Sequence, residues 1–485
     1  MFLEPTEKTN ITMKTLLFLS SSRRNSPFFV FSILASVGPA LFSLVLLTTV
    51  GSVIAQTERA DRSPQVHKQP SIDPVRTWNE QAIETVRAKN AIDAQAARLY
   101  AMVNIAMYDA VNGIESRHES KDDRAPALVD PSGAPSDGDV FAAAVSAAHT
   151  VLVGEYPDRA AIYDAQKQTD LAAIRKGGKK SKGEEWGMQV GTQVRAARAN
   201  DGSTPVEPPQ PGGMGPGQFP GTFSNPQFRN LQPFGIADSS IYVGTGPAPL
   251  ASLEYAAAFD VVKVLGQTTP NTGSAAENEQ FRKTFRFWAL GNNTAQPPGA
   301  WVQIALDVLT NHPLPLADAT RLLALETIAM ADTVAPTFMT KFVFHHWRPT
   351  TAIQQADTDG NPLTEKDAGW TSRGGVGGTP EYWSGHSSFS AAAAAVLAGF
   401  FCNDNISFSL TADPNDSAAL GETRMYSSFS SAASEAGISR IYGGLHFPFS
   451  NEDGLTAGRA IAREILANKL LLLKGRQTHF GECPL

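Results

Sequence analysis

The chain has 485 residues and a formal net charge of −7, from 40 lysines and arginines against 47 aspartates and glutamates. This length allows one large or two modest domains with a substantial core. The acidic balance argues against nucleic acid as a partner, because no basic block is larger than the short stretch 176–182 (KGGKKSK).

The first 55 residues are typical of an export signal. Lys14, Arg23 and Arg24 precede a long apolar stretch at 28–50, and small residues at 53–55 suit cleavage. We therefore expect an exported protein, periplasmic or secreted. The apolar stretch is longer than a usual signal core, so a single membrane anchor is the alternative to cleavage.

A polar linker at 56–77 leads into an N-terminal helical half at 78–200. Hydrophobic periodicity predicts two helices within 78–112 and two or three more within 137–200. Between 201 and 250, 19 of the 50 residues are glycine or proline, which forbids a continuous helix or strand. This composition predicts a long loop, and loops of this length are usually functional or linkers.

Helical patterns resume at 251–473, which we expect to form a C-terminal bundle, followed by a tail at 474–485. The expected helices cover 252–265, 275–290, 299–311, 316–345, the stretch after 384, 426–437 and 451–472. Strand signals are sparse, so the predicted fold class is all-α. The two cysteines, Cys402 and Cys483, could form one disulfide or stay as free thiols.

Three short segments of the C-terminal half carry the donor groups that a tetrahedral oxyanion needs. They are 341–349 (KFVFHHWRP), 384–386 (SGH) and 439–446 (SRIYGGLH). Their functional groups are two arginines, a lysine, a serine, a glycine amide and two histidines. The residues concerned are Lys341, Arg348, Ser384, Gly385, His386, Arg440 and His446.

The spacing within each segment has a geometric interpretation. Lys341 and Arg348 are seven residues apart, which predicts that both project from one side of a helix that ends before Pro349. The SGH segment runs into an alanine-rich stretch and should occupy a helix N-terminus, where free amides favour an anion. A bend at 443–444 is expected to turn Arg440 and His446 to the same side.

The order and spacing of these motifs resemble those of the vanadium-dependent haloperoxidases and the related type 2 phosphatidic acid phosphatases. The resemblance, to the bacterial haloperoxidase-like branch, extends over about residues 75–470 and includes 98–112 (RLYAMVNIAMYDAVN) and 287–299 (FWALGNNTAQPPG). It implies helical bundles of the haloperoxidase and acid phosphatase type, with the anion site in the second half.

The resemblance also implies vanadate as the cofactor, with phosphate able to occupy the same site. The groups that would bind its equatorial oxygens are Lys341, Arg348, Ser384, the Gly385 amide and Arg440. His446 would bond to the vanadium, and His386 would be the acid and base that transfers protons when hydrogen peroxide binds. The implied reaction oxidises a halide with hydrogen peroxide to a halogenating species, which could act on an organic acceptor.

Two departures from the family pattern concern the surroundings of this site. Ser450 stands four residues after His446, where many relatives carry an aspartate that hydrogen-bonds the histidine, so Asp453 or a backbone carbonyl could serve instead. Thr379 falls where better-known haloperoxidases place an aromatic residue or a histidine beside the halide. The halide is therefore not fixed by the sequence, and bromide or iodide is favoured over chloride.

Two other functions remain open. A phosphatase of the same superfamily would use His446 to attack phosphorus and His386 to protonate the leaving oxygen of a phosphate monoester. A non-catalytic oxyanion-binding protein would not need His386. His345 and His346 are expected to pack or cap rather than bind a metal. Homo-oligomers are common among relatives, although no residue pattern reveals a self-complementary surface.

Overall fold

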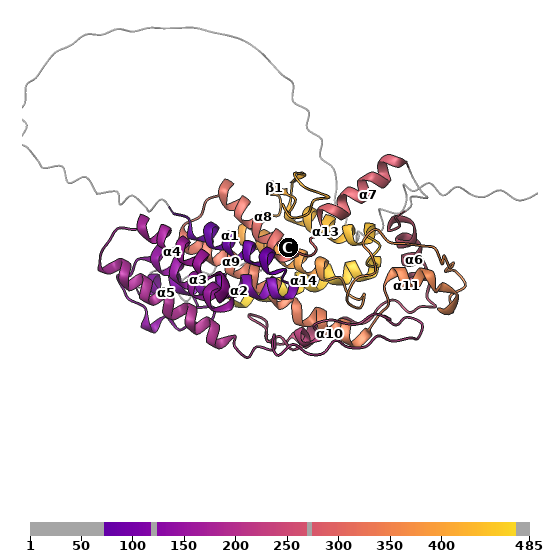
Figure 1. The fold of residues 1–485 in the computed structure, drawn as a ribbon, viewed down its shortest axis with the longest axis horizontal. Helices are drawn as coiled ribbons and strands as arrows, with labels where there is room; N and C mark the ends of the chain where they lie inside the picture. Colours follow the sequence, from indigo (N-terminus) through magenta and orange to yellow (C-terminus); the bar gives the residue numbers. More distant parts are fainter. Residues whose placement is uncertain (1–71, 118–123, 269–273, 472–485) are drawn as a thin grey trace, which may run out of the picture. The chain divides into compact units, whose positions relative to one another are not determined.

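The computed structural model describes residues 72–117, 124–268 and 274–471, all within one unit of the chain, Lys68–Leu485. The predicted export signal, most of the linker, Cys483 and the C-terminal tail lie outside these residues. Helices dominate the described parts (Figure 1), which confirms the all-α fold class. Their bounds are α1 (Pro74–Lys89), α2 (Asp93–Ser116), α3 (Val140–Glu155), α4 (Ala160–Ala173), α5 (Gly178–Ala197), α6 (Leu253–Leu265), α7 (Ala275–Phe287), α8 (Gln296–Asn311), α9 (Leu316–Asp332), α10 (Val334–Phe344), α11 (Pro349–Gln354), α12 (Gly385–Phe401), α13 (Phe429–Tyr442) and α14 (Pro448–Asn468).

A small antiparallel sheet is the exception to the helical pattern. Strands β1 (Phe408–Thr411) and β2 (Thr423–Tyr426) pair with Phe408 opposite Tyr426. Phe408 stacks on both Tyr426 and Phe429, which fixes the sheet to the start of α13. The hairpin therefore extends the helical core without changing its class.

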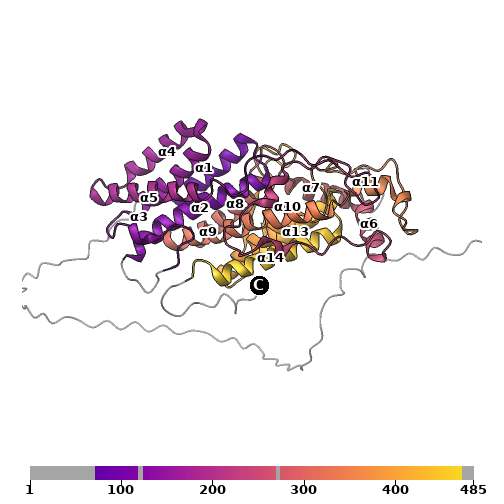
Figure 2. The same cartoon turned by 90° about the horizontal axis from the view of Figure 1, so that it is seen from below.

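Helix α2 connects the two halves of the described chain. It packs against α3 and α5 on one side and against α8 and α9 on the other. Nearly every residue from Ala94 to Ile114 is buried, as expected for a helix that is apolar on all its faces. Figures 1 and 2 both show α3, α4 and α5 on one side of this helix and α6 and α11 far from them on the other.

The apolar run 316–345, predicted as one helix, is two helices that meet at Thr333. Pro336 in the first turn of α10 has no N–H to bond to Asp332, so the backbone ladder of α9 cannot continue through it. The stretch Leu316–Phe344 is long and apolar enough to cross a membrane, but 94% of its apolar 18-residue window is buried inside the protein. It therefore forms core helices.

Helices α12 and α14 run in the same direction and lie in close contact through two glycines. A Cβ atom at Gly454 would lie 2.6 Å from the Ser384 carbonyl oxygen, and one at Gly458 would lie 2.3 Å from that of Ser388. Both distances are below any real contact, so only glycine permits this approach. The contact holds the N-terminus of α12 against α14.

Residues 201–250 contain two short 3-10 helices, Pro226–Asn230 and Ser239–Tyr242, and otherwise irregular backbone. The buried carboxylate of Asp332 accepts hydrogen bonds from the backbone N–H groups of three consecutive residues of this segment, Phe234, Gly235 and Ile236. Asp109 of α2 binds the amides of Ala127, Leu128 and Val129 in the same manner. Both aspartates thus bind backbone amides of loop residues, and neither forms an ion pair with an arginine of the predicted site in the described structure.

Candidate active site

Six of the seven predicted site residues line one cavity of about 200 Å3: Lys341, Arg348, Gly385, His386, Arg440 and His446. The N-terminal ends of α2 and α12, the helix α10, the last turn of α13 and the loop at 377–379 enclose it. Val334, Phe338, Phe389 and Leu445 supply apolar walls. The structure therefore brings together groups that the sequence separates by more than a hundred positions.

Ser384 is the seventh residue, and it lies behind the cavity wall. It is fully buried, and its hydroxyl oxygen accepts a hydrogen bond from the Ser387 hydroxyl at 2.8 Å. It also caps α12, as the predicted helix N-terminus requires. In this arrangement the Ser384 side chain shapes the first turn of α12, and Gly385 follows it at the cavity.

Lys341 and Arg348 do not lie on one helix, contrary to the sequence expectation. Helix α10 ends at Phe344 because His345 takes a left-handed conformation (φ 47°) and caps it. The following residues form bridges to the glycine-rich segment instead: Phe219 donates its N–H to the His345 carbonyl, and Trp347 donates to that of Gly217. Arg348 reaches the cavity from this extended connection.

The ammonium group of Lys341 is hydrogen-bonded to the loop that precedes α12. Its Nζ atom donates to the backbone carbonyls of Pro380 (2.5 Å) and Glu381 (3.1 Å), and the residue is buried. Burial, followed by the nearby charge of Arg348, holds the pKa of Lys341 well below its usual range. An anion in the cavity would reverse this shift, because it would stabilise the charged ammonium group.

Arg348 and Arg440 differ in how many partners they have. The guanidinium of Arg348 donates to the carbonyls of Thr379 and Leu445, each at 2.8 Å, and its NH1 atom lies 3.0 Å from His446 Nε2. The Nε and NH1 atoms of Arg440 are buried and have no hydrogen-bond partner in the described chain. Burial lowers the pKa of Arg440 to about 9, with a smaller effect from Arg348. Donors left unpaired in a buried site are costly, so this guanidinium is suited to an external acceptor.

The predicted bend after α13 turns Arg440 and His446 toward the same cavity. Gly444 adopts φ 67°, a conformation open to glycine, and the Leu445 amide bonds back to the Arg440 carbonyl at 3.0 Å.

The partner of His446 is Glu381, which the sequence analysis missed. Its Oε1 atom lies 2.9 Å from His446 Nδ1 and accepts the Phe447 amide at 3.0 Å, and its carboxyl group is fully buried. Asp453 is not the hydrogen-bond partner of His446, because its carboxylate accepts a hydrogen bond from the Tyr382 hydroxyl. A carboxylate at Nδ1 fixes the proton there and leaves Nε2 as the lone-pair nitrogen beside Arg348.

Both histidines of the cavity are favoured in the neutral form. Burial, followed by Arg348, lowers the pKa of His446 well below its usual value, and burial followed by Arg440 does the same for His386. His386 lies in the first turn of α12, with its Nε2 atom 3.2 Å from the Ala289 carbonyl. A neutral imidazole can act as a ligand, a nucleophile or a proton acceptor.

Asp93 is a second carboxylate at the cavity that the sequence analysis did not identify. It is the first residue of α2, so it enters from the N-terminal half of the chain. Burial raises the pKa of Asp93, while the Ala94 amide and the charges of Lys341 and Arg440 act in the opposite direction. No motif marks this residue, because only the packing of α2 brings it to the site.

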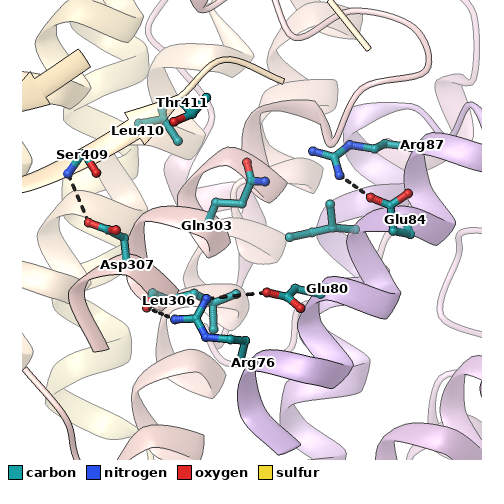
Figure 3. Close-up of a pocket in the computed structure, with 11 residues that line it drawn as sticks. Arg76, Glu80, Glu84, Arg87, Gln303, Leu306, Asp307, Ser409, Leu410 and Thr411 are labelled. Atoms are coloured by element: carbon teal, nitrogen blue, oxygen red, sulfur yellow. Dashed lines mark hydrogen bonds and ion pairs between the residues drawn. The ribbon is translucent and has the colours of Figure 1, made fainter. Parts of the chain in front are cut away.

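A second polar cavity, of about 250 Å3, lies between α1, α8 and β1 (Figure 3). Its charges are satisfied within the protein. Arg76 lies 3.6 Å from Glu80, and Arg87 contacts both Glu84 at 2.5 Å and the buried Asp413 at 3.0 Å. Its two arginines are outnumbered by the carboxylates of Glu80, Glu84 and Asp307, so no positive charge is left over to attract an anion.

The second half of the chain matches a known domain family. Residues 321–475 match the family model described as the VCPO second helical-bundle domain, and this range contains all seven predicted site residues. No curated protein sequence matches the chain.

Solved structures with a similar fold include bacterial vanadium haloperoxidases. A bacterial vanadium-dependent iodoperoxidase aligns with a TM-score of 0.64 and 22% identity, over 84% of this chain and 100% of its own. The holo form of a bacterial vanadium-dependent chloroperoxidase aligns with a TM-score of 0.58 and 16% sequence identity, over 84% of this chain and 93% of its own. The apo form of a bacterial vanadium-dependent chloroperoxidase aligns with a TM-score of 0.58 and 14% sequence identity, over 76% of this chain and 91% of its own. The fold and the domain match confirm the resemblance to the vanadium haloperoxidase superfamily.

Proposed function

We propose that this protein is an exported vanadate-dependent haloperoxidase that oxidises a halide, bromide or iodide, with hydrogen peroxide. The observation that supports this most directly is the buried guanidinium of Arg440, whose Nε and NH1 atoms have no partner in the described chain and which borders the cavity. Lys341 and Arg348 add two further cations to the same cavity. This donor set fits a tetrahedral oxyanion of multiple negative charge.

The residues that would hold vanadate follow from this geometry. Lys341, Arg348, Arg440 and the Gly385 amide would bind its oxygens, and His446 Nε2 would be the nitrogen ligand. Ser384 is proposed as a ligand from the motif, although its hydroxyl bonds to Ser387 in the structure. When bound, vanadate supplies a Lewis acid that makes hydrogen peroxide reactive toward a halide.

The protein's own contribution is orientation and proton transfer. Glu381 holds His446 with Nε2 toward the cavity, through the 2.9 Å contact at Nδ1. His386, neutral and beside the cations, can take a proton from hydrogen peroxide and return it to the leaving oxygen. Phe338 and Phe389 limit water at the cavity wall. Contacts within the protein hold both histidines, so little reorganisation is required when a ligand binds.

A bromination assay with a vanadate titration tests the proposal. The mature protein would be freed of phosphate and assayed with hydrogen peroxide, bromide and a dione reporter while orthovanadate is added. We expect activity to rise saturably with vanadate and phosphate to compete. Iodide in place of bromide, in the same assay, tests the halide preference. The absence of halogenation with either halide at any vanadate concentration would contradict the proposal.

A phosphatase is the second candidate, and the orientation of His446 is the observation that favours it. With Nδ1 bonded to Glu381, the free Nε2 is also the nitrogen that a phosphohistidine intermediate requires. Hydrolysis of a phosphate monoester, inhibited by vanadate, would distinguish this activity from the peroxidase. A His386→Ala variant with unchanged turnover would instead point to a protein that binds an oxyanion without catalysis.

A further inference from the structure

Asp93 is a carboxylate in a cavity that is otherwise suited to bind an anion. Within the described chain, its only hydrogen bond to another residue is from the Ala94 amide, at 2.8 Å to Oδ1. Its Oδ2 atom lies 3.9 Å from the place that a Cβ on Gly385 would occupy. The carboxylate therefore faces the residue whose amide is proposed to bind the anion.

The titratable groups around Asp93 come from three other helices that border the cavity and from the connections between elements. Lys341 lies on α10, His386 on α12 and Arg440 on α13, while Arg348 and His446 line the rest of the cavity. Neither Lys341 nor Arg440 is within ion-pair distance of Asp93 in the described structure, although both act on it through their charges. Asp93 thus shares the cavity with the cations without neutralising them by contact.

An oxyanion in this cavity would meet two kinds of partner. The lysine, the arginines and the Gly385 amide are donors, and they suit unprotonated oxygens. An ionised carboxylate only accepts hydrogen bonds, so it suits an oxygen that carries a proton. Two acceptors that face each other with no proton between them are destabilised by repulsion and by lost hydration.

We propose that Asp93 is a specificity residue that selects oxyanions bearing a hydroxyl group, such as hydrogen phosphate and hydrogen vanadate, and rejects those without one. This inference rests on the proposed function, because it concerns the same anion site. Sulfate has the same shape and charge as hydrogen phosphate but carries no proton near neutral pH. The dianion of a phosphate monoester also lacks a hydroxyl. Asp93 therefore disfavours the monoester substrate of a phosphatase, whereas hydrogen peroxide can donate a hydrogen bond to it.

The test compares phosphate with sulfate on the purified protein by isothermal titration calorimetry. A single pH of about 8 is used, far above the ordinary aspartate pKa, because burial raises the pKa of Asp93. We expect the wild type to bind phosphate more tightly than sulfate. In Asp93→Asn, which keeps the size of the side chain and adds a donor, the ratio of the two affinities should fall on the order of tenfold or more, mainly because sulfate binds better. Asp93→Ala should lower the ratio in the same direction.

Asp139→Asn is the matched control. Asp139 also lies at a helix N-terminus and accepts an amide hydrogen bond, from Ala142 in α3, but it does not line the cavity. Its substitution should leave the ratio unchanged. Thermal unfolding of each variant checks that the fold is retained.

Three outcomes are distinguishable. A ratio that collapses in Asp93→Asn and persists in Asp139→Asn supports the inference. Equal binding of phosphate and sulfate to the wild type, or an unchanged ratio in both Asp93 variants, overturns it while leaving the anion site intact. If the wild type binds neither anion, the anion site fails, and the proposed function fails with it.

Discussion

Two polar cavities among the described residues are similar in size and opposite in the way the charges of their arginines are satisfied. In the cavity between α1, α8 and β1, Arg87 pairs with Asp413. In the cavity at the N-terminus of α12, two donor atoms of Arg440 have no partner among the described residues, and Lys341 and Arg348 add two more cations. The larger of the two, the neutralised cavity, is the one whose two arginines are paired with carboxylates. Unsatisfied positive charge therefore distinguishes the candidate anion site better than volume does.

The largest expected difference between the cavities is in activity. His446→Ala removes the nitrogen proposed as the vanadium ligand and should lower the bromination rate by about a thousandfold or more, as loss of a central catalytic group does. Glu80→Gln, in the neutralised cavity, should leave the rate within about twofold. Steady-state bromination kinetics at saturating vanadate measure both. Comparable losses in the two variants would remove the functional distinction between the cavities.

Substitution of one arginine in each cavity should destabilise the protein in one case and not in the other. Arg87→Met leaves the buried Asp413 without its ion-pair partner and should cost about 3–5 kcal/mol in the free energy of unfolding. Arg440→Met removes a cation with unpaired donors and should not destabilise the anion-free protein, although it should weaken phosphate binding by about a hundredfold. Urea denaturation and calorimetry give the two quantities.

This prediction is contradicted if Arg440→Met is destabilised as much as Arg87→Met. That result would show that the fold itself depends on the Arg440 charge.

A smaller effect is expected from the carboxylate that orients His446. Glu381→Gln keeps an oxygen that can accept the Nδ1 proton but removes the charge, so vanadate affinity and turnover should each fall about ten- to a hundredfold. Ser450→Ala removes only the longer 3.2 Å contact to Nδ1 and should change both by less. Vanadate titrations of the bromination rate separate affinity from turnover. Equal effects of the two substitutions would argue against Glu381 as the orienting group.

The smallest effect concerns single neutral hydrogen bonds. Thr379→Val removes the hydroxyl that accepts from Arg348 at 3.1 Å, and phosphate affinity should fall by about three- to tenfold. Gln303→Leu, at the wall of the neutralised cavity, should leave phosphate affinity unchanged. Calorimetry on both variants decides whether the loop at 377–379 contributes to the anion site.

Most helices, and six residues that line the candidate cavity, could be predicted because they belong to local sequence patterns. Alanine-rich sequence after SGH predicted α12, and the glycine pair after Arg440 predicted the bend that returns His446 to the cavity. Such features depend on neighbours within a few positions, where backbone geometry limits the choices.

The errors and omissions arose where distant segments decide the structure. Helix α10 stops at Phe344 because the next residues form bridges to 217–219, and nothing in 341–349 contains that information. Glu381 is an ordinary loop carboxylate until Phe447 and His446 fold onto it. Asp93 reaches the cavity only through the packing of α2. A single sequence has no local signal for these contacts.

The glycine contact between α12 and α14 has a consequence for any attempt to evolve this protein in the laboratory. Ser384 and Gly385 begin the helix that Gly454 and Gly458 hold in place, although neither glycine lines the cavity. A mutation at either glycine would displace the backbone that presents the anion donors while leaving every donor unchanged. Mutant libraries that vary only the residues lining the cavity would not sample these two glycines. Libraries that vary the whole of α14 would contain many inactive variants, because most of them would replace Gly454 or Gly458 at the contact with α12.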